Sequence, residues 1–314
     1  MKKVFDIVGR WHLWVLFALW WMSVALFLFF TNLRLSIEFT GGIQAQLAQI
    51  NNVDSLKTDL QDFLQQKGLK DVEVGIAKEK NYYNLLIKVQ IPQDKDAMQI
   101  SDSIKWFLLS KWYVKDSNDI LSFALVGPSI GDYMKKSAVK AIIWALVLIV
   151  VYMLFAFASI REYISPLLLA LVTLFTLLFD VSSAAWFYGL WEMINPTIQV
   201  NSIFIIGVLI IMGYSINDTI IIFDRIRENL ILDSSKLKKG KITEREIFNK
   251  SLWQTMRRSI GTSLSTLLAL LALFVFGTEL LRIFAVVVGV GVIAGTYSSI
   301  FVAAPLAYFL SWRK

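Results

Sequence analysis

Long apolar stretches constrain this sequence more than any other feature. A helix that crosses a bilayer needs about 20 consecutive, mostly apolar residues, and the chain contains six such runs. Only 18% of its 314 residues are charged, whereas soluble domains contain about 25%. The sequence therefore predicts a multi-pass α-helical membrane protein with six transmembrane helices. The predicted spans are 11–31, 138–158, 164–188, 199–223, 260–277 and 281–310.

The composition also argues against several kinds of chemistry. There are no cysteines, which excludes disulfides, thiolate metal sites and cysteine nucleophiles. The single histidine, His12, argues against a histidine metal cluster and against a Ser-His-Asp triad. No Walker-type phosphate loop is present, so we expect no nucleotide, metal or other cofactor. The net charge of +7 comes mostly from membrane edges, so we expect no nucleic-acid partner.

Residues 33–134 form the only stretch outside the predicted spans that is long enough to fold as a soluble domain. Two segments have helical spacing of apolar residues, and four alternate as strands do. In chain order these are strand 35–48 with a bulge or kink at Gly41-Gly42, helix 53–66, strands 72–77 and 83–91 around the turn 78–81, helix 97–112 and strand 120–126. The order β-α-β-β-α-β predicts a ferredoxin-like α+β domain.

The expected domains are an N-terminal region with the first span (1–31), an external ferredoxin-like domain (32–134) and a five-helix membrane domain (135–314). The loop 225–258 has ten Lys/Arg and four Asp/Glu, whereas 189–198 has no Lys or Arg. By the positive-inside rule, the larger loop and both termini are then cytoplasmic. The first span lacks a clear cleavage site, so we expect a retained anchor.

The most specific run in the sequence is Gly213–Asn229, which reads GYSINDTIIIFDRIREN. It resembles the signature of the fourth membrane helix in the SecF branch of the SecD/SecF family. Further resemblances lie at Phe39–Gly42, Val126–Pro128, Asn249–Ser265 and Gly295–Ile300, in the family's order. Two departures are mild: Glu38 stands where the family usually has Asp, and Ser259 where Thr commonly follows the arginine.

The resemblance implies a subunit of the bacterial Sec protein-export machinery, within the proton-driven RND superfamily. It implies SecD and the SecYEG channel as partners, with YajC as a further candidate, in the lipids of the cytoplasmic membrane. With SecD, such a subunit uses the proton motive force to assist late translocation of an unfolded protein, without ATPase activity of its own. Two alternatives stay open: a non-motor assembly subunit and an RND-type efflux transporter.

Ionisable side chains within the predicted spans indicate the candidate site. Placing such a group in a bilayer costs about 2.5–3.5 kcal/mol on insertion scales, so it marks function or pairing. Asp180 lies in the third span, Asp218 in the fourth, and Arg258 near the start of the fifth. Since the fourth span ends where the fifth starts, Asp218 and Arg258 can be neighbours. We expect these three residues to couple proton movement, with Asp180 as a more external station.

Other interpretations of these residues stay open. Asp218 can form a static ion pair, Asp180 can hydrogen-bond Ser182, Ser183 or a neighbouring helix, and Arg258 can extend to lipid phosphates. Gly291 and Gly295 have the small-xxx-small spacing of helix packing. The supporting polar or ion-pair candidates are Asn217, Asp224, Arg225, Thr262 and Ser263.

Overall fold

The computed structural model describes residues 6–48, 50, 52–78, 83–90, 97–194 and 199–312. The chain divides into two compact units. The helical unit consists of 1–32, 141–191 and 203–314, and the α/β unit of 33–140 and 192–202.

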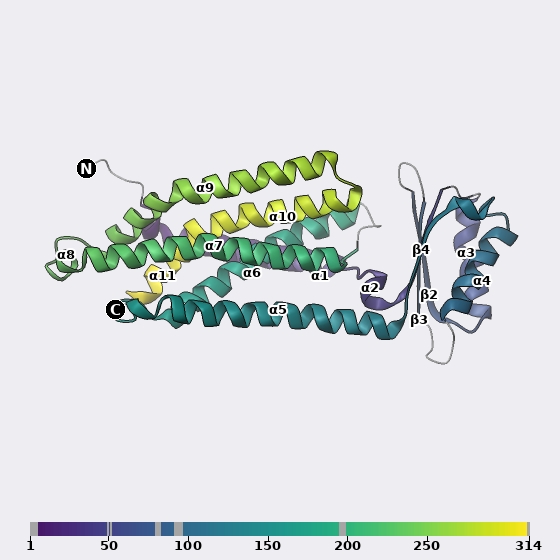
Figure 1. Cartoon of the computed structure of the whole chain (residues 1–314), viewed down its shortest axis with the longest axis horizontal. Coiled ribbons are helices and arrows are strands. Elements are labelled where there is room, and N and C mark those ends of the chain that lie inside the picture. The colour runs from purple at the N-terminus through teal and green to yellow at the C-terminus, as the bar shows by residue number, and fades with distance from the viewer. Residues whose placement is uncertain are drawn as a thin grey trace. The chain divides into compact units, whose positions relative to one another are not determined.

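The described residues contain six helices that are long and apolar enough to cross a membrane, which confirms the number and the approximate place of the predicted spans. These helices run alongside one another in Figure 1. They are α1 (Trp11–Asn32), α5 (Pro128–Ala156), α6 (Pro166–Ile194), α7 (Ser202–Leu232), α9 (Glu244–Phe276) and α10 (Glu279–Ser298). The sixth span continues from α10 through a π-helical turn, η4 (Ser299–Ala303), into α11 (Ala304–Ser311). Three short helices complete this set: η1 (Val8–Arg10), η3 (Ala158–Ile160) and α8 (Ser234–Lys238).

The prediction of a long loop over 225–258 was wrong. Helix α7 continues to Leu232 and α9 begins at Glu244. A capping box starts α9, because the Thr243 hydroxyl accepts from the Glu246 amide and the Glu246 carboxylate accepts from the Thr243 amide. Hydropathy locates the apolar part of a helix but not the polar turns beyond it. For the same reason α5 begins at Pro128, ten residues before the predicted start at 138.

Aromatic and aliphatic packing closes one end of the helical unit. Phe157, Phe223 and Phe248 are fully buried there, and the rings of the first two meet edge to face with centroids 6.0 Å apart. The segment before α1 joins this core, since Asn249 of α9 accepts hydrogen bonds from the amides of Ile7 (3.0 Å) and Val8 (3.3 Å). The amide side chain of Asn249 thus fixes the start of the chain against α9.

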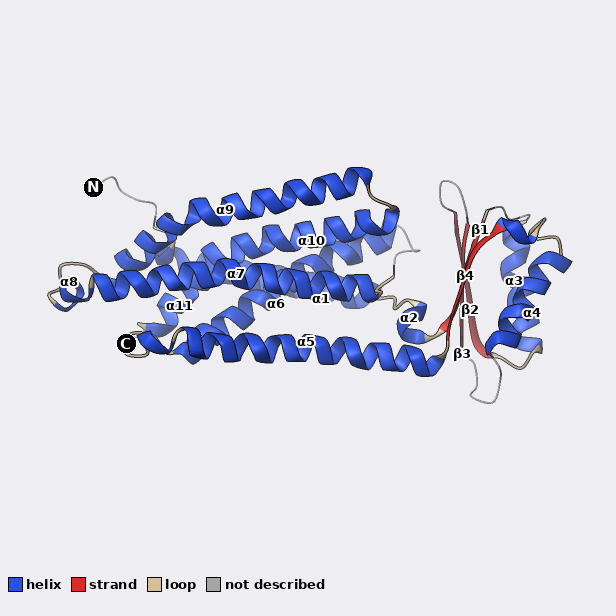
Figure 2. Cartoon of the chain, in the orientation of Figure 1, coloured by secondary structure: helices blue, strands red, loops and turns tan. Residues whose placement is uncertain are grey.

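The α/β unit contains one four-stranded antiparallel sheet with the strand order β2-β3-β1-β4. Its elements are α2 (Ile37–Thr40), β1 (Gly42–Leu47), α3 (Val53–Gln66), β2 (Lys70–Lys78), β3 (Tyr83–Gln90), α4 (Ala97–Ser110), η2 (Ser117–Asp119) and β4 (Ile120–Val126). Helices α3 and α4 lie on the same face of the sheet (Figure 2). From β1 onward the order of strands and long helices is the predicted β-α-β-β-α-β. The predicted turn at 78–81 lies mostly outside the described residues.

The core of this sheet follows from the two periodicities in the sequence. On β1, Ile43, Ala45 and Leu47 alternate with polar residues and are fully buried. On α3, Leu56 and Leu60 recur at four-residue spacing and face the same core. The alternation in β1 and the spacing in α3 therefore bury one shared apolar layer.

The predicted strand start at residue 35 was wrong, because residues Ile37–Thr40 form the short helix α2. The carbonyl of Ser36 accepts from the amides of Phe39 (3.0 Å) and Thr40 (3.1 Å), which bends the chain into a turn. Gly41 then ends the turn with a φ of 73°, a conformation that favours glycine. The alternation of apolar residues over 35–39 imitated a strand.

Removing a core side chain from α3 tests this packing. Leu60 is 0% exposed, whereas Leu121 on the edge strand β4 is 54% exposed. We expect Leu60→Ala to lower the free energy of unfolding of the α/β unit by about 3 kcal/mol, and Leu121→Ala to lower it by about 0.5 kcal/mol or less. Hydrogen exchange of the β1 and β3 amides in the detergent-solubilised chain measures both changes. Equal effects of the two variants would contradict the proposed core.

Candidate functional site

Buried polar side chains gather inside the helical unit on α6, α7, α9 and α10. Apolar residues surround them, so each polar group needs a partner or a function. The buried polar residues of these spanning helices and of η4 are Thr173, Thr176, Asp180, Ser182, Ser183, Ser215, Asp218, Thr219, Asn229, Ser251, Thr255, Ser259, Ser263, Ser298 and Ser299. Two of them, Asp180 and Asp218, can carry a charge.

Asp180 is held between α6 and its neighbours. Its side chain is 0% exposed, and one carboxyl oxygen accepts a hydrogen bond from the hydroxyl of Ser215 on α7. Ser298 of α10 is a further neighbour of this carboxyl group. Ser182 and Ser183 instead donate to the carbonyl of Phe179 on their own helix. The sequence analysis considered Ser182, Ser183 or a neighbouring helix as the partner of Asp180. The structure shows a residue of a neighbouring helix.

Asp218 lies on a different side of α7 and faces α9. Its side chain is 1% exposed, and neither carboxyl oxygen has a hydrogen-bond partner among the residues that the structure describes. The hydroxyl groups of Ser259, Thr262 and Ser263 and the charge of Arg258 act on this carboxyl group. The acid is thus surrounded by α9 groups, which can respond to its charge.

Arg258 does not lie at the start of its helix, contrary to the prediction, because α9 begins at Glu244. Its side chain is exposed. Within the described part of the chain no ion pair joins Arg258 to Asp218. The structure brings the two residues near enough for their charges to interact, but it does not lock them into a salt bridge.

Hydroxyl pairs connect α10 and η4 to α7 and α9. Thr219 of α7 shares a hydrogen bond of 2.9 Å with Ser299, and Ser263 of α9 shares one of 2.5 Å with Thr296 of α10. Ser299 begins the π-helical turn η4, a geometry that occurs often at functional sites. The sequence analysis identified the Gly295–Ile300 motif and named Ser263 as a supporting polar candidate, but it assigned no role to Thr219, Thr296 or Ser299. Their serine and threonine content within an apolar span was the available signal.

Gly291 and Gly295 let α10 approach α7 closely. A Cβ on Gly291 would lie 2.4 Å from the side chain of Ile211, and one on Gly295 would lie 3.0 Å from the Cβ of Ser215. Gly295 therefore keeps α10 against the serine that holds Asp180. Of the two glycines predicted for helix packing, Gly295 contacts the serine that binds Asp180, and Gly291 contacts Ile211.

No hydrogen bond joins the remaining polar candidates to the buried acids in the described part of the chain, although the Thr262 hydroxyl lies close enough to act on Asp218. Asn217 is exposed. Asp224 pairs with Arg227 on the same helix, and Arg225 pairs with Glu228. The hydroxyl of Thr262 donates to the carbonyls of Arg258 (3.1 Å) and Ser259 (2.9 Å) of its own helix.

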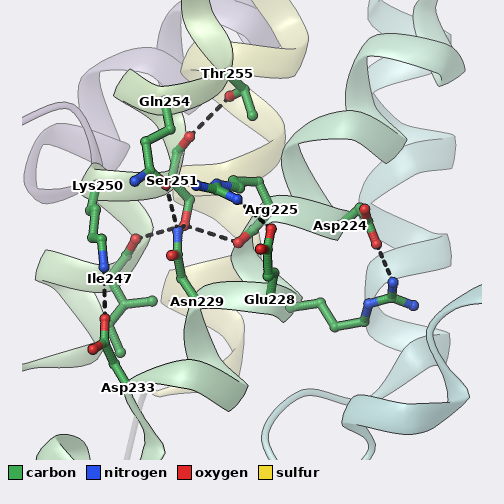
Figure 3. A network of polar contacts seen from close by, with 11 residues as sticks. Asp224, Arg225, Glu228, Asn229, Asp233, Ile247, Lys250, Ser251, Gln254 and Thr255 are labelled. Atoms are coloured by element: carbon green, nitrogen blue, oxygen red, sulfur yellow. Dashed lines mark hydrogen bonds and ion pairs between the residues drawn. The ribbon is translucent and has the colours of Figure 1, made fainter.

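A polar network joins α7 to α9 beyond the apolar part of both helices, as Figure 3 shows. The amide nitrogen of Asn229 donates to Ser251 and to Gln254, each at 2.8 Å. The guanidinium of Arg225 donates to the same Gln254 oxygen at 2.7 Å. Asp233, just after α7, accepts from Lys250 of α9 at 2.8 Å. Sequence reasoning missed this network because it treated 225–258 as a loop.

The described residues contain no group of three or more His, Cys, Asp or Glu side chains placed to hold a metal ion. With six apolar helices long enough to cross a membrane, the chain is a multi-pass membrane protein that has carboxylates buried among these helices. Residues 110–313 match the family described as "Protein export membrane protein SecD/SecF, C-terminal". The chain therefore belongs to the SecD/SecF family.

Curated relatives and a solved structure agree with this membership. The chain is 34% identical over 278 residues to the protein translocase subunit SecF of Thermodesulfovibrio yellowstonii, covering 88% of this chain and 83% of the relative. It is 32% identical to that of Alicyclobacillus acidocaldarius, covering 100% and 94%. The crystal structure of SecDF, a translocon-associated membrane protein from Thermus, matches with a TM-score of 0.75 at 29% identity. That match covers 99% of this chain, which spans 39% of the SecDF chain.

The close packing of α10 on α7 predicts a strong effect of one methyl group. The Ile211 side chain is 0% exposed, so it cannot move aside into solvent. We expect Gly291→Ala to lower the free energy of unfolding by about 1–3 kcal/mol, the usual cost of overpacking. Gly289→Ala is the matched control on the same helix, because its Cβ would lie 3.7 Å from the nearest atom. Thermal unfolding in detergent compares them, and equal stabilities would contradict the contact.

The Asp233 cluster predicts a pH dependence. Hydrogen bonds from Lys236 and Lys250 lower the pKa of Asp233 from 3.8 to about 2. A lowered folded-state pKa contributes stability above the unfolded value and loses it as pH falls. We therefore expect Asp233→Asn to destabilise the chain at pH 7, and the difference from the parent to shrink between pH 4 and pH 2.

Unfolding in detergent across this pH range measures the effect. Asp102→Asn is the control, because Asp102 forms an exposed pair with Lys105 at 3.8 Å, and exposed pairs contribute little. A difference between Asp233→Asn and the parent that stays constant down to pH 2 would show that the ionised carboxylate is not the stabilising group.

Proposed function

We propose that this chain is a SecF-type subunit of a protein translocase. In this proposal it works with SecD and uses the proton motive force to assist late translocation of unfolded proteins. The observation that carries the proposal is Asp218, a buried acid without a hydrogen-bond partner among the described residues. The names of the relatives, all translocase subunits, support the export function.

The surroundings of Asp218 favour a change of protonation over a static role. Burial disfavours the charged form of a carboxyl group, whereas a nearby arginine and hydroxyl donors favour it. Arg258 and the α9 hydroxyls supply the second effect, and the surrounding apolar residues supply the first. Protonation removes the attraction between α7 and α9, so a proton that arrives at Asp218 changes how these helices pack. Asp180 provides a second carboxyl group on the other side of α7.

The proposed partners follow from the family. The relative from Thermus thermophilus is named SecDF, and this chain covers 34% of its length, which supports SecD as the immediate partner. The SecYEG channel, YajC and an unfolded exported protein are further proposed partners. We propose no ATPase activity for this chain, so that the proton gradient supplies the energy.

The proposed orientation places both termini on the cytoplasmic side and residues 32–134 outside. The segment 225–258 has ten Lys/Arg against four Asp/Glu, and cytoplasmic segments carry such an excess. In this orientation the polar network of Asn229, Ser251 and Gln254 is cytoplasmic. The α/β unit is then available to contact a chain that emerges from the channel.

Replacing Asp218 tests the proposal directly. Asp218→Asn keeps the size of the side chain but cannot release or bind a proton, so we expect gradient-stimulated export into membrane vesicles to fall by about tenfold or more. The complex with SecD should still assemble. Glu162→Gln is the control, because Glu162 is an exposed acid outside the spanning helices.

Two measurements separate this function from an assembly role. Co-purification with SecD reports assembly, and export with and without a proton gradient reports coupling. Failed assembly of Asp218→Asn would favour the scaffold interpretation, and unchanged gradient-driven export would refute proton use at this residue.

A further inference from the structure

The carboxylate of Glu38 binds the first residue of α7. One oxygen of Glu38, on α2, accepts hydrogen bonds from the backbone amide of Ser202 (2.7 Å) and from its hydroxyl (2.6 Å). The first amides of a helix lack partners within the helix, and its N-terminus carries a partial positive charge. Glu38 therefore caps α7 from a segment that lies 164 residues away in the sequence.

Backbone hydrogen bonds support this link on the preceding residues. The amide of Ser36 donates to the carbonyl of Val200 at 2.9 Å, and the amide of Val200 donates to the carbonyl of Arg34 at 2.8 Å. Leu35 and Val200 form a parallel bridge. The segment that follows α1 is thus joined to the segment that leads into α7.

The start of α5 packs on the same short helix. A Cβ on Gly131 would lie 2.9 Å from the amide nitrogen of Gly41 and 3.2 Å from the carbonyl oxygen of Phe39. Both contacts are to backbone, which cannot rotate away as a side chain can. Helix α2 therefore contacts Gly131 near the start of α5 and Ser202, the first residue of α7, and Gly41 connects it to β1.

The capped helix also carries the acid on which the proposed function depends. Asp218 lies 16 residues after Ser202 on α7, about 24 Å along one continuous helix. A helix transmits an axial shift or a rotation along its length, and the hydrogen bonds of Glu38 pass that movement to α2. From α2 it reaches β1 through the backbone at Gly41.

We propose that Glu38 is a positioning residue that couples movement of α7 to the α/β unit. The proposal rests on the proposed function, since proton movement at Asp218 is the source of the motion. If Glu38 only stabilised the fold, its loss would lower stability, but the molecules that still fold would show the normal gradient-driven movement. The two roles therefore predict different results for a gradient-driven movement.

The experiment follows the movement with spin labels in the assembled complex with SecD in proteoliposomes. The chain has no native cysteine. Cysteines introduced as Lys57→Cys on α3 and Glu162→Cys, both at exposed positions, therefore carry the only spin labels on this chain. We expect a distance change on imposing a proton gradient in the parent. In Glu38→Ala we expect this change to disappear and export to fall by about tenfold, while gradient-driven proton uptake persists.

Further variants separate the charge from the fold. Glu38→Gln keeps an acceptor and the size of the side chain, so we expect it to retain part of the movement. Ser202→Ala removes the hydroxyl donor. When it is combined with Glu38→Ala, we expect no further loss of movement or export, because the two residues act through one contact. Asp132→Asn is the control, since Asp132 is exposed in the same unit, and it should behave as the parent.

The outcomes distinguish this inference from the proposed function. Gradient-driven movement and export that persist in Glu38→Ala would overturn the inference. If Glu38→Ala does not fold, full movement in Glu38→Gln together with additive stability losses for Glu38→Gln and Ser202→Ala would overturn it. If the parent itself shows no gradient-dependent proton uptake or movement, the proposed function fails. In that case the stability losses of the Glu38 and Ser202 variants still test the contact, because non-additive losses show that the two residues interact.

Discussion

The cost of placing a carboxyl group among apolar helices constrains the whole helical unit. Asp180 and Asp218 are both buried, yet only Asp180 has a hydrogen-bond donor in the described structure. In a medium of low dielectric constant a charge interacts strongly with any partner and is costly without one. Helices α7, α9 and α10 bring hydroxyl groups or an arginine to these acids.

Side chains of helix α7 contact different neighbouring helices, because they project in different directions around the helix axis. Successive residues turn by about 100° around a helix, so Thr219 lies about 40° from Ser215 in one direction and Asp218 about 60° from it in the other. Ser215 contacts α6, Thr219 contacts Ser299 of η4, and Asp218 faces α9. A rotation of α7 that moves Asp218 relative to α9 therefore also moves the donor to Asp180. Asp218 and the donor to Asp180 thus lie on the same helix.

The sequence was sufficient for the architecture because apolar runs and periodicity follow directly from burial. It placed all six spans and most elements of the sheet, and it selected Asp180 and Asp218 from their cost in a bilayer. It could not place Ser215, since a serine in a spanning helix most often bonds to its own backbone. It also could not show that Arg258 stands apart from Asp218, because hydropathy gives no side-chain direction and misplaced the start of α9.

The polar ends of α7 were the other feature that sequence reasoning missed, and they share a physical cause. Asn229 and Asp233 bind α9 at one end, and Glu38 binds Ser202 at the other. Each of these contacts joins residues that are distant in sequence or lie on polar turns beyond an apolar run, where no periodic pattern marks them. In the proposal above, Glu38, which differs from the usual family residue by one methylene group, positions the first residue of the helix that carries Asp218.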